Sequence, residues 1–454
     1  MNKTRGQWSS NIGFIFATAG SAIGLGNIWK FPGKVGMGGG GAFMVIYFAI
    51  VFTVGISIML TELVVGRKTQ KNAVEAFNDL NPKWKFTGIL GVLSAFIVLS
   101  YYCVIGGYVL KYVVTYIAGA NFSGGYEQYF NSFVTNPITP IIYLILFMAL
   151  TSFIVTCGIS GGIEKANKLL MPTLFILLFI LLIRSLTIKG ASEGISFLFT
   201  FDFGKITPNI LLTALGQALF SLSIGLGTAC TYASYLGKKE NLAKNAGVIC
   251  TLDTFVAFLS AFIIIPAVFA TGTPLTSGNS FAFIALPGIF DKMPAGTFFG
   301  GLFYILLTFA ALTSSISLME TIVAYVSENM KMSRKKAAVI ISSSMLFLGI
   351  LYSLSQGALP LHGIWYTVRD GITFPTFGVM MEHITDYIMI PLGGLFFCVF
   401  VGWIWGSKNA IDEITQNGTI KFRLQKIWSF TIKYIAPILI AIVMIMEFAG
   451  NIKF

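Results

Sequence analysis

A chain of 454 residues in which 56% are hydrophobic and only 11% are charged lacks the charge that soluble domains carry at their surfaces, where roughly 25% is usual. The mean hydropathy of +0.81 and recurring apolar stretches of about 20 residues predict a polytopic membrane protein instead. The five cysteines all lie in apolar stretches, so no disulfide framework is expected. The basic start leads into a long apolar and then glycine-rich segment, which predicts no cleaved signal peptide.

Eleven membrane spans are predicted, and lipid is therefore the main solvent. Their approximate ranges are 11–36, 42–66, 88–118, 139–158, 168–188, 207–236, 244–270, 298–326, 336–354, 388–406 and 428–450. With the N-terminus inside, the inner segments hold 20 of the 30 Lys and Arg residues. The positive-inside rule thus predicts a cell (inner or plasma) membrane protein with a cytoplasmic N-terminus and an external C-terminus. The net charge of +12 follows from this topology and needs no nucleic-acid partner.

The segment 355–387 mixes glycine, proline, histidine and charge. It is predicted to be a long external loop, and it carries both histidines of the chain, His362 and His383. No nucleophile and base are paired in the sequence, so we expect that the chain is not an enzyme.

Glycines interrupt the first and the sixth predicted spans. The first contains GSAIGLGNIWKFP at residues 20–32, and the sixth contains FSLSIGLGT at residues 220–228. Each helix-interior glycine costs about 1 kcal/mol relative to alanine. Five spans separate the two segments, so the second copy has the opposite topology. Paired interruptions of this kind indicate a transporter binding site, whereas close helix packing is the alternative for either one alone.

The backbone at such a break must face protein, water or ligand. The end of one half-helix offers carbonyl groups to a cation, and the start of the next offers N–H groups to an anion. A sodium ion and a zwitterionic amino acid match this pattern. Neutral oxygen ligands lie beside the breaks and in the eighth span, at Ser21, Asn27, Ser221, Ser223 and residues 313–315.

Three acidic residues, Glu62, Asp253 and Glu320, lie within predicted spans. An acid at membrane depth is a functional candidate. Asp253 has no basic residue within a helical turn, so a cation is its natural partner. Glu62 and Glu320 are equally compatible with hydrogen-bonded packing behind the site.

These motifs resemble those of the neurotransmitter:sodium symporter family. The resemblance rests on RGQW at 5–8, residues 20–32, GGGAF at 39–43, GQALFSLSIG at 216–225, TYASY at 231–235 and AALTSS at 310–315, and it extends to about residue 405. It implies one all-α transporter domain (1–454) with two inverted five-helix repeats, about 8–190 and 205–406, in which helices 1 and 6 are unwound. An eleventh helix follows at about 428–450.

The resemblance also implies site residues. The first of two sodium sites is expected at Ala22, Asn27, Ser221 and Asp253. The second is expected at the carbonyl groups of Gly20, Ile23 and Ala310 and the hydroxyl groups of Thr313 and Ser314. The amino-acid substrate is expected at Ala22, Gly24, Leu25, Gly26, Val104, Tyr108, Phe220, Ser221, Ser223, Leu226, Ser314 and Leu318. In this scheme the Leu25 and Gly26 amides and the Tyr108 hydroxyl hold its carboxylate, and Phe220 with Tyr108 forms an outer lid. The expected gates are Lys30 with Asp386 outside and Arg5 with Glu328 inside.

Departures from the family pattern sharpen these expectations. Lys30 replaces an arginine and cannot form a bidentate fork to a carboxylate. Asp253 replaces an asparagine and supplies the negative charge that chloride-dependent members obtain from an anion near the position of Ala257, so chloride-independent transport is predicted. Gly24 lacks the carboxylate of monoamine carriers, and Leu226 leaves more room than phenylalanine. A hydrophobic or aromatic L-amino acid is therefore the predicted substrate.

Two other functional classes remain open at this point. A substrate sensor would keep the site but lose transport. A channel would need a continuous polar pore, which the predicted lid argues against.

Overall fold

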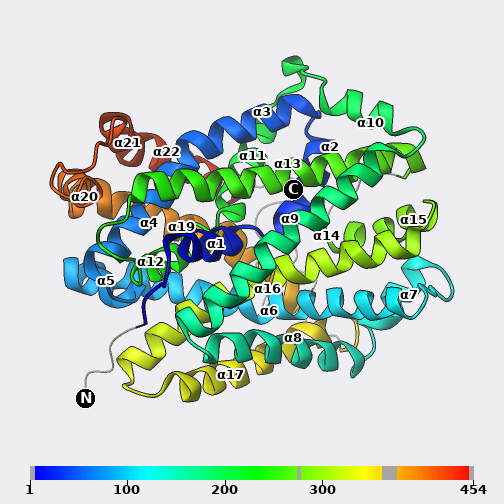
Figure 1. Cartoon of the computed structure of the whole chain (residues 1–454), viewed down its shortest axis with the longest axis horizontal. Coiled ribbons are helices and arrows are strands. Elements are labelled where there is room, and N and C mark those ends of the chain that lie inside the picture. The colour runs from blue at the N-terminus through cyan, green and yellow to red at the C-terminus, as the bar shows by residue number, and fades with distance from the viewer. Residues whose placement is uncertain (1–5, 274–277, 360–375, 449–454) are drawn as a thin grey trace.

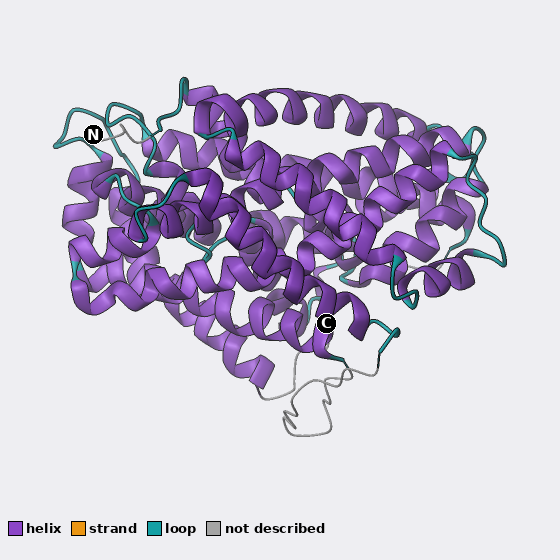
Figure 2. Ribbon diagram, turned by 90° about the horizontal axis from the view of Figure 1, so that it is seen from below, coloured by secondary structure: helices purple, strands orange, loops and turns teal. Residues whose placement is uncertain are grey.

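The computed structural model describes residues 6–273, 278–359 and 376–448, and these residues form helices joined by turns and loops, without a β-strand (Figure 2). Most of the long helices run along the long axis of the molecule (Figure 1). Large apolar side chains such as Ile145, Phe153 and Phe347 are exposed on them and suit contact with lipid. The architecture confirms the predicted all-helical polytopic fold.

The first half of the chain contains five predicted spans. They are α1 (Asn11–Ala22) with η1 (Gly26–Lys30) and α2 (Phe31–Met37); α3 (Gly41–Ile50), η2 (Val51–Gly55) and α4 (Ile56–Thr69); α6 (Lys85–Ile117); α8 (Thr139–Thr156); and η4 (Ile159–Ile163) with α9 (Glu164–Leu186). Shorter elements connect them, namely α5 (Ala73–Leu80), η3 (Pro82–Trp84), α7 (Tyr126–Val134), α10 (Ala191–Leu198) and η5 (Phe203–Lys205).

The second half repeats this plan and adds one span. Its spans are α11 (Pro208–Ser221) with α12 (Thr228–Ala233); α13 (Leu242–Thr271); α16 (Gly296–Asn329); α17 (Arg334–Ser355); α18 (Phe377–His383), η7 (Ile384–Met389), α19 (Ile390–Val399) and η8 (Phe400–Ile404); and α21 (Gln425–Phe430), η9 (Thr431–Ile435) and α22 (Ala436–Phe448). The connecting elements are α14 (Gly278–Ser280), η6 (Phe281–Ala285), α15 (Leu286–Asp291) and α20 (Ser407–Ile414).

Within the described ranges, nine helices are long and apolar enough to cross a membrane, and the pair α1 and η1–α2, bent by 56°, makes a tenth. The sixth predicted span is divided into α11 and α12, neither of which is long enough alone. The predicted unwinding of helices 1 and 6 is therefore confirmed. All five cysteines are free.

The segment before the tenth span differs from the prediction. That span begins at Phe377 rather than at about 388, so His383 lies in a helix and not in a loop, whereas His362 lies outside the described residues. The sequence MMEHITDYIM (380–389) carries its charges among apolar residues, which hid the helix from a hydropathy argument.

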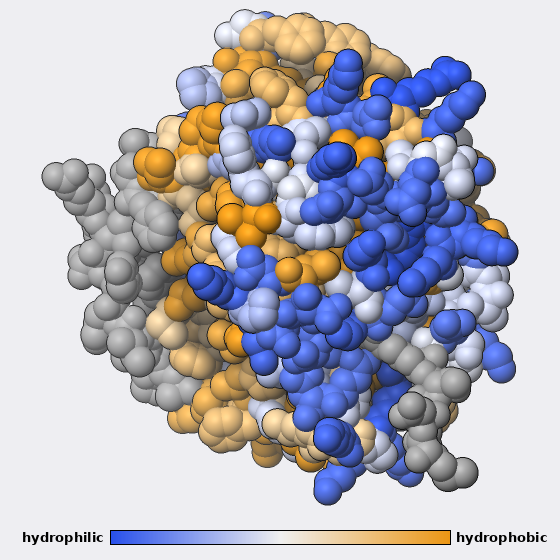
Figure 3. All heavy atoms as spheres, turned by 90° about the vertical axis from the view of Figure 1, so that its left-hand side faces the viewer, coloured by the Kyte–Doolittle hydropathy of each residue, from blue (hydrophilic) through white to orange (hydrophobic). Residues whose placement is uncertain are grey.

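One end of the molecule carries many hydrophilic side chains. Hydrophilic side chains gather at the end that carries α5 and α20, and Figure 3 shows this face. Exposed lysines lie there, between α4 and α6 and from the end of α16 into the first turn of α17: Lys71, Lys83, Lys331, Lys335 and Lys336. We call this face the basic end; α7, α10 and α15 lie at the opposite end (Figure 1).

The interior is built around α1. This helix packs against α9, α13 and α16, and α16 also packs along α6. α4 and α12 also pack closely together. Their contact requires glycine at position 66, because a Cβ on Gly66 of α4 would overlap the Cys230 carbonyl of α12. α1 also contacts α12, so the two broken spans meet inside the bundle.

Candidate functional site

The first break lies between α1 and η1. α1 ends at Ala22, and the capping residue Ile23 has extended backbone with φ −71° and ψ 99°. Carbonyl groups at the end of a helix lack partners inside it, so those at the end of α1 are available to a ligand. The Asn27 side-chain oxygen accepts a hydrogen bond from the Gly24 N–H at 3.0 Å, which stabilises the break.

The second break spans residues 222–227, between α11 and α12. Ser223, Gly225 and Gly227 all have left-handed backbone, with φ values of 52°, 89° and 70°. The fully buried Glu62 accepts a hydrogen bond from the Gly225 N–H at 2.7 Å. Glu62 therefore supports the break from behind and does not line the cavity.

A cavity lies where the two breaks meet. Most of the predicted substrate residues line it, namely Ala22, Gly24, Leu25, Gly26, Phe220, Ser221, Ser223, Leu226, Ser314 and Leu318. Val98, Tyr101, Tyr102 and Ile390 also line it and were not predicted. Apolar side chains thus share the cavity with the start of η1, and the start of a helix favours an anion.

Val104 and Tyr108 do not belong to this cavity, and their assignment was wrong. The Tyr108 ring packs against Phe130, Phe133 and Phe283. Tyr102 takes the predicted place, because its hydroxyl accepts a weak hydrogen bond from the Leu25 N–H at 3.4 Å.

The cause of this error is a register offset in α6. Six residues along an α-helix correspond to about 9 Å of rise and about 240° of rotation. Tyr102 and Tyr108 therefore face different surroundings, and Val98 likewise takes the place expected for Val104.

Asn27, Ser221 and Asp253 form a buried polar cluster beside Ala22. The Asn27 amide donates to Ser221 Oγ at 2.8 Å and to Asp253 Oδ1 at 2.7 Å. Ser221 Oγ donates to the two Asp253 oxygens at 3.1 and 3.0 Å. Among the described residues the hydrogen-bonding neighbours of this carboxylate are neutral, so a cation would compensate its buried charge.

A second oxygen cluster joins the end of α1 to α16. Ser314 Oγ lies 3.3 Å from the carbonyl oxygens of Gly20 and Ile23. The Thr313 hydroxyl lies 3.0 Å from the Ala310 carbonyl oxygen. Thr313 also lies against Gly20, since a Cβ built there would be 3.1 Å from Thr313 Cβ. The residues expected for the second site therefore lie where α1 contacts α16, and such carbonyl and hydroxyl groups are suited to sodium.

Known proteins resemble this chain in sequence and in fold. The sequence profile described as the sodium:neurotransmitter symporter family matches residues 5–123 and 130–451. A sodium-dependent transporter of Bacillus subtilis (strain 168) is 37% identical over 96% of both chains, and one of Haemophilus influenzae (strain ATCC 51907) is 35% identical over 98% of both. The crystal structure of MhsT in complex with L-phenylalanine aligns with a TM-score of 0.87 at 40% identity, covering 97% of this chain and 99% of that one.

The chain belongs to the sodium:neurotransmitter symporter family. It is therefore a multi-pass, sodium-dependent membrane transporter and not an enzyme.

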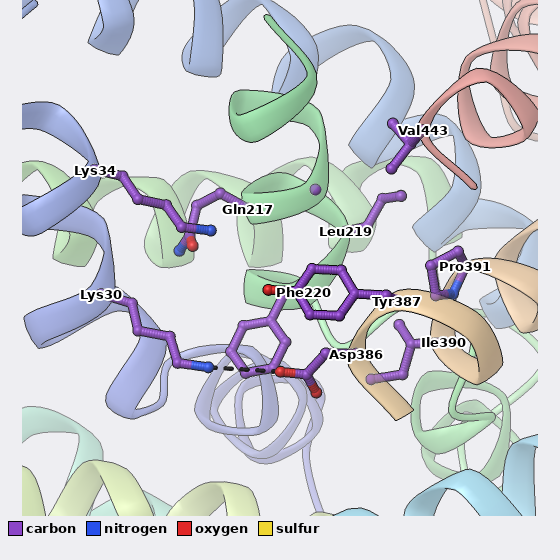
Figure 4. Close-up of a pocket in the computed structure, with 11 residues that line it drawn as sticks. Lys30, Lys34, Gln217, Leu219, Phe220, Asp386, Tyr387, Ile390, Pro391 and Val443 are labelled. Carbon is purple, nitrogen blue, oxygen red and sulfur yellow. Dashed lines mark ion pairs between the residues drawn. The ribbon is translucent and has the colours of Figure 1, made fainter. Parts of the chain in front are cut away.

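An outer cavity of the symporter adjoins the central one (Figure 4). Lys30 Nζ lies 3.6 Å from Asp386 Oδ2, so the structure brings the expected outer gate pair together. The same ammonium group lies 4.3 Å from the centre of the Phe220 ring. Phe220 lines both cavities and separates them, while Tyr101 donates to Asp386 at 3.0 Å.

The predicted gate at the basic end is only partly visible, because Arg5 lies outside the described residues. Its expected partner Glu328 accepts a hydrogen bond from the Asn72 side chain at 2.6 Å. Nearby, the Trp8 indole donates to the Tyr232 carbonyl at 2.9 Å and ties the segment before α1 to α12.

Sequence reasoning missed one ion pair of this region. Arg334 binds the fully buried Glu320, and the Tyr235 hydroxyl donates to the same carboxylate at 2.8 Å. Glu320 is thus a packing partner, as one of the two interpretations held. An acid buried in a span was the signal to look for a cation, but Arg334 is 14 residues away across the turn between α16 and α17.

Proposed function

We propose that the protein carries out sodium-coupled symport of a hydrophobic or aromatic L-amino acid by alternating access. The observation that carries this proposal is that Leu25 and Gly26, at the start of η1, line the same cavity as apolar walls from Val98, Leu226 and Leu318. A zwitterion with an apolar side chain complements both. The likeness to MhsT, solved with L-phenylalanine, supports the same substrate class.

The two oxygen clusters are the proposed sodium sites. Ala22, Asn27, Ser221 and Asp253 would hold one ion, completed by the substrate carboxylate. Gly20, Ile23, Ala310, Thr313 and Ser314 would hold the second. Because the first ion and the substrate share ligands, each would tighten the binding of the other.

Tyr102 is the proposed hydroxyl partner of the substrate carboxylate. Tyr102→Phe should weaken amino-acid binding about 10-fold or more, since a hydrogen bond to a charged group is worth about 1.5–3 kcal/mol. Tyr108→Phe is the matched control and should bind within about 3-fold of wild type, because Tyr108 packs elsewhere. Radioligand binding to both variants shows which tyrosine contacts the substrate. A larger loss of affinity in Tyr108→Phe than in Tyr102→Phe would contradict the assignment of Tyr102.

Leu226 is the proposed determinant of substrate size. It is buried in the cavity wall, and Leu226→Phe should therefore shift preference from phenylalanine towards smaller side chains such as alanine. Filling a well-packed site typically costs about 1–3 kcal/mol, so phenylalanine affinity should fall about 5- to 100-fold. Competition binding measures this shift, and unchanged phenylalanine affinity would place the side-chain pocket elsewhere.

Transport is proposed to be independent of chloride. Asp253 already supplies a negative charge beside the first sodium site, and the buried Ala257 one turn further along α13 offers no polar group for an anion. Replacing chloride with gluconate at constant sodium should leave the uptake rate unchanged, because the ionic strength and therefore the screening stay the same. A steep loss of uptake would overturn this prediction.

The orientation of the chain in the membrane and the bounds of its two repeats complete the proposal. We place the basic end in the cytoplasm, since lysine and arginine favour that side, and the opposite end outside, in an inner or plasma membrane. The repeats are assigned to about 8–190 and 205–406, with about 428–450 as the extra helix.

Sodium-gradient-driven uptake into proteoliposomes tests the function directly. With labelled phenylalanine and a panel of competing amino acids, hydrophobic and aromatic L-isomers should compete and acidic or basic ones should not. Binding without uptake or counterflow would instead identify a substrate sensor.

A further inference from the structure

A separate cavity lies at the external end of the molecule, between the end of α6, α15 and the start of α16. It encloses about 250 Å³, compared with about 50 Å³ for the central cavity. Its described lining includes Tyr116, Phe122, Asp291, Met293 and Thr297. It shares no lining residue with the central or the outer cavity, so the transport site does not account for it.

Tyr116 presents a polar group at this cavity that lacks a partner. The residue is 5% exposed, and its hydroxyl forms no hydrogen bond within the described part of the chain. Its ring stacks on Tyr304 at 5.3 Å and lies against Gly300, where a Cβ would overlap it. An unpaired buried hydroxyl costs about 1–3 kcal/mol, so this group can accept or donate a hydrogen bond to water or to a ligand in the cavity.

Asp291 carries the charge at this cavity, as the one ionisable carboxylate among the described lining residues. Two cationic side chains of this region donate to backbone oxygens: Lys292 to the Thr271 carbonyl and Arg184 to the Pro294 carbonyl, both at 3.0 Å. Both keep their charge, and the exposed Asp291 is the carboxylate to which a ligand cation could bind.

Tyr126 stabilises this carboxylate from the side. Its hydroxyl donates to Asp291 Oδ2 at 2.7 Å. Burial and this hydrogen bond raise the pKa of Tyr126 to about 12, so the donor keeps its proton at neutral pH. A carboxylate accepts about four hydrogen bonds, and capacity remains for a ligand.

We propose that this cavity binds a small organic ammonium ion with an apolar ring, whose ammonium group pairs with Asp291 and donates to the Tyr116 hydroxyl. Phe122, whose ring lies 5.7 Å from that of Tyr116, supplies an aromatic wall suited to a cation. The ligand would join α15 to α6.

That bridge has a mechanical consequence. α15 continues from η6, which contains Phe283. The Phe283 ring packs on Trp29 with the ring centres 5.6 Å apart, and the Phe283 carbonyl oxygen accepts a hydrogen bond from the Tyr112 hydroxyl at 2.6 Å. A molecule that fixes α15 would hold this segment against the outer end of the broken first span. The inference does not depend on which amino acid is transported.

Benzylamine, protonated at neutral pH, is the probe for this site. Thermal unfolding of the purified full chain is followed in sodium-free potassium buffer, in which sodium-coupled binding at the central site is absent. Benzylamine should raise the melting temperature saturably, whereas neutral benzyl alcohol should not. Asp291→Asn and Tyr116→Phe keep the shape of their side chains, and each should lower benzylamine affinity at least 10-fold.

Glu193→Gln is the matched control, because Glu193 is an exposed carboxylate on α10 at the same end and does not line the cavity. It should respond to benzylamine as wild type does. The absence of a saturable shift in wild type, or an equal shift in Asp291→Asn, would overturn the proposal and leave a cavity filled by water.

Discussion

Asn27→Ala is expected to abolish sodium-dependent substrate binding at physiological sodium. The Asn27 side chain joins three parts of the site: its oxygen holds the Gly24 N–H, and its amide donates to Ser221 and Asp253. Its removal deletes a proposed sodium ligand and leaves the buried Asp253 carboxylate with one partner fewer. Hydrogen bonds to charged groups contribute about 1.5–3 kcal/mol each, so we expect sodium affinity to fall about 100-fold or more.

Asn245→Ala provides the control for this prediction. Asn245 is also a buried asparagine, and it exchanges two side-chain hydrogen bonds with Asn11 at 2.9 and 3.2 Å near the beginning of α13. Its substitution should lower thermal stability while the sodium dependence of binding stays as in wild type. Equal sodium dependence in both variants would remove Asn27 from the ion site.

Gly225→Ala is expected to reduce uptake below about one tenth of the wild-type rate. Gly225 has φ 89°, a region that costs an L-residue about 1 kcal/mol or more. An added Cβ would also overlap the Ile390 carbonyl oxygen of α19. Relieving this overlap would shift the backbone at Gly225 or at Ile390. Such a shift would disturb the second break, which Glu62 stabilises by its hydrogen bond to the Gly225 N–H.

Gly247→Ala is the matched substitution, since Gly247 lies in α13 and an added Cβ meets nothing within 4 Å. It should leave uptake unchanged and stabilise the helix by up to about 1 kcal/mol. Uptake and melting temperature measured on both variants test the prediction. Full activity in Gly225→Ala would show that the left-handed turn is not needed.

Features with a local chemical signature were predictable from the sequence. Two glycines within three residues marked each break, and lysines at the ends of apolar stretches marked the basic end. Asp253 was singled out because no cation lies within a helical turn. In each case a single segment contains the physical cause, so tertiary packing did not have to be known.

Features that depend on register or on distant partners were not predictable. α6 contains tyrosines at 101, 102, 108, 112 and 116 but no break that fixes their depth, so Tyr108 was mistaken for Tyr102. Arg334 meets Glu320 only because the turn before α17 folds it back onto α16. The contact between Asn27 and Asp253 was expected only from the family resemblance, because 226 residues separate the two in the sequence.

In the proposed mechanism the two breaks form one site at which sodium and a zwitterionic amino acid bind together. Equilibrium binding of labelled L-phenylalanine to the purified protein, titrated against sodium at constant ionic strength with potassium as the replacement, tests it most directly. Sodium should raise phenylalanine affinity, and phenylalanine should raise sodium affinity by the same factor, as linkage requires. Equal phenylalanine affinity in sodium and in potassium would contradict the account.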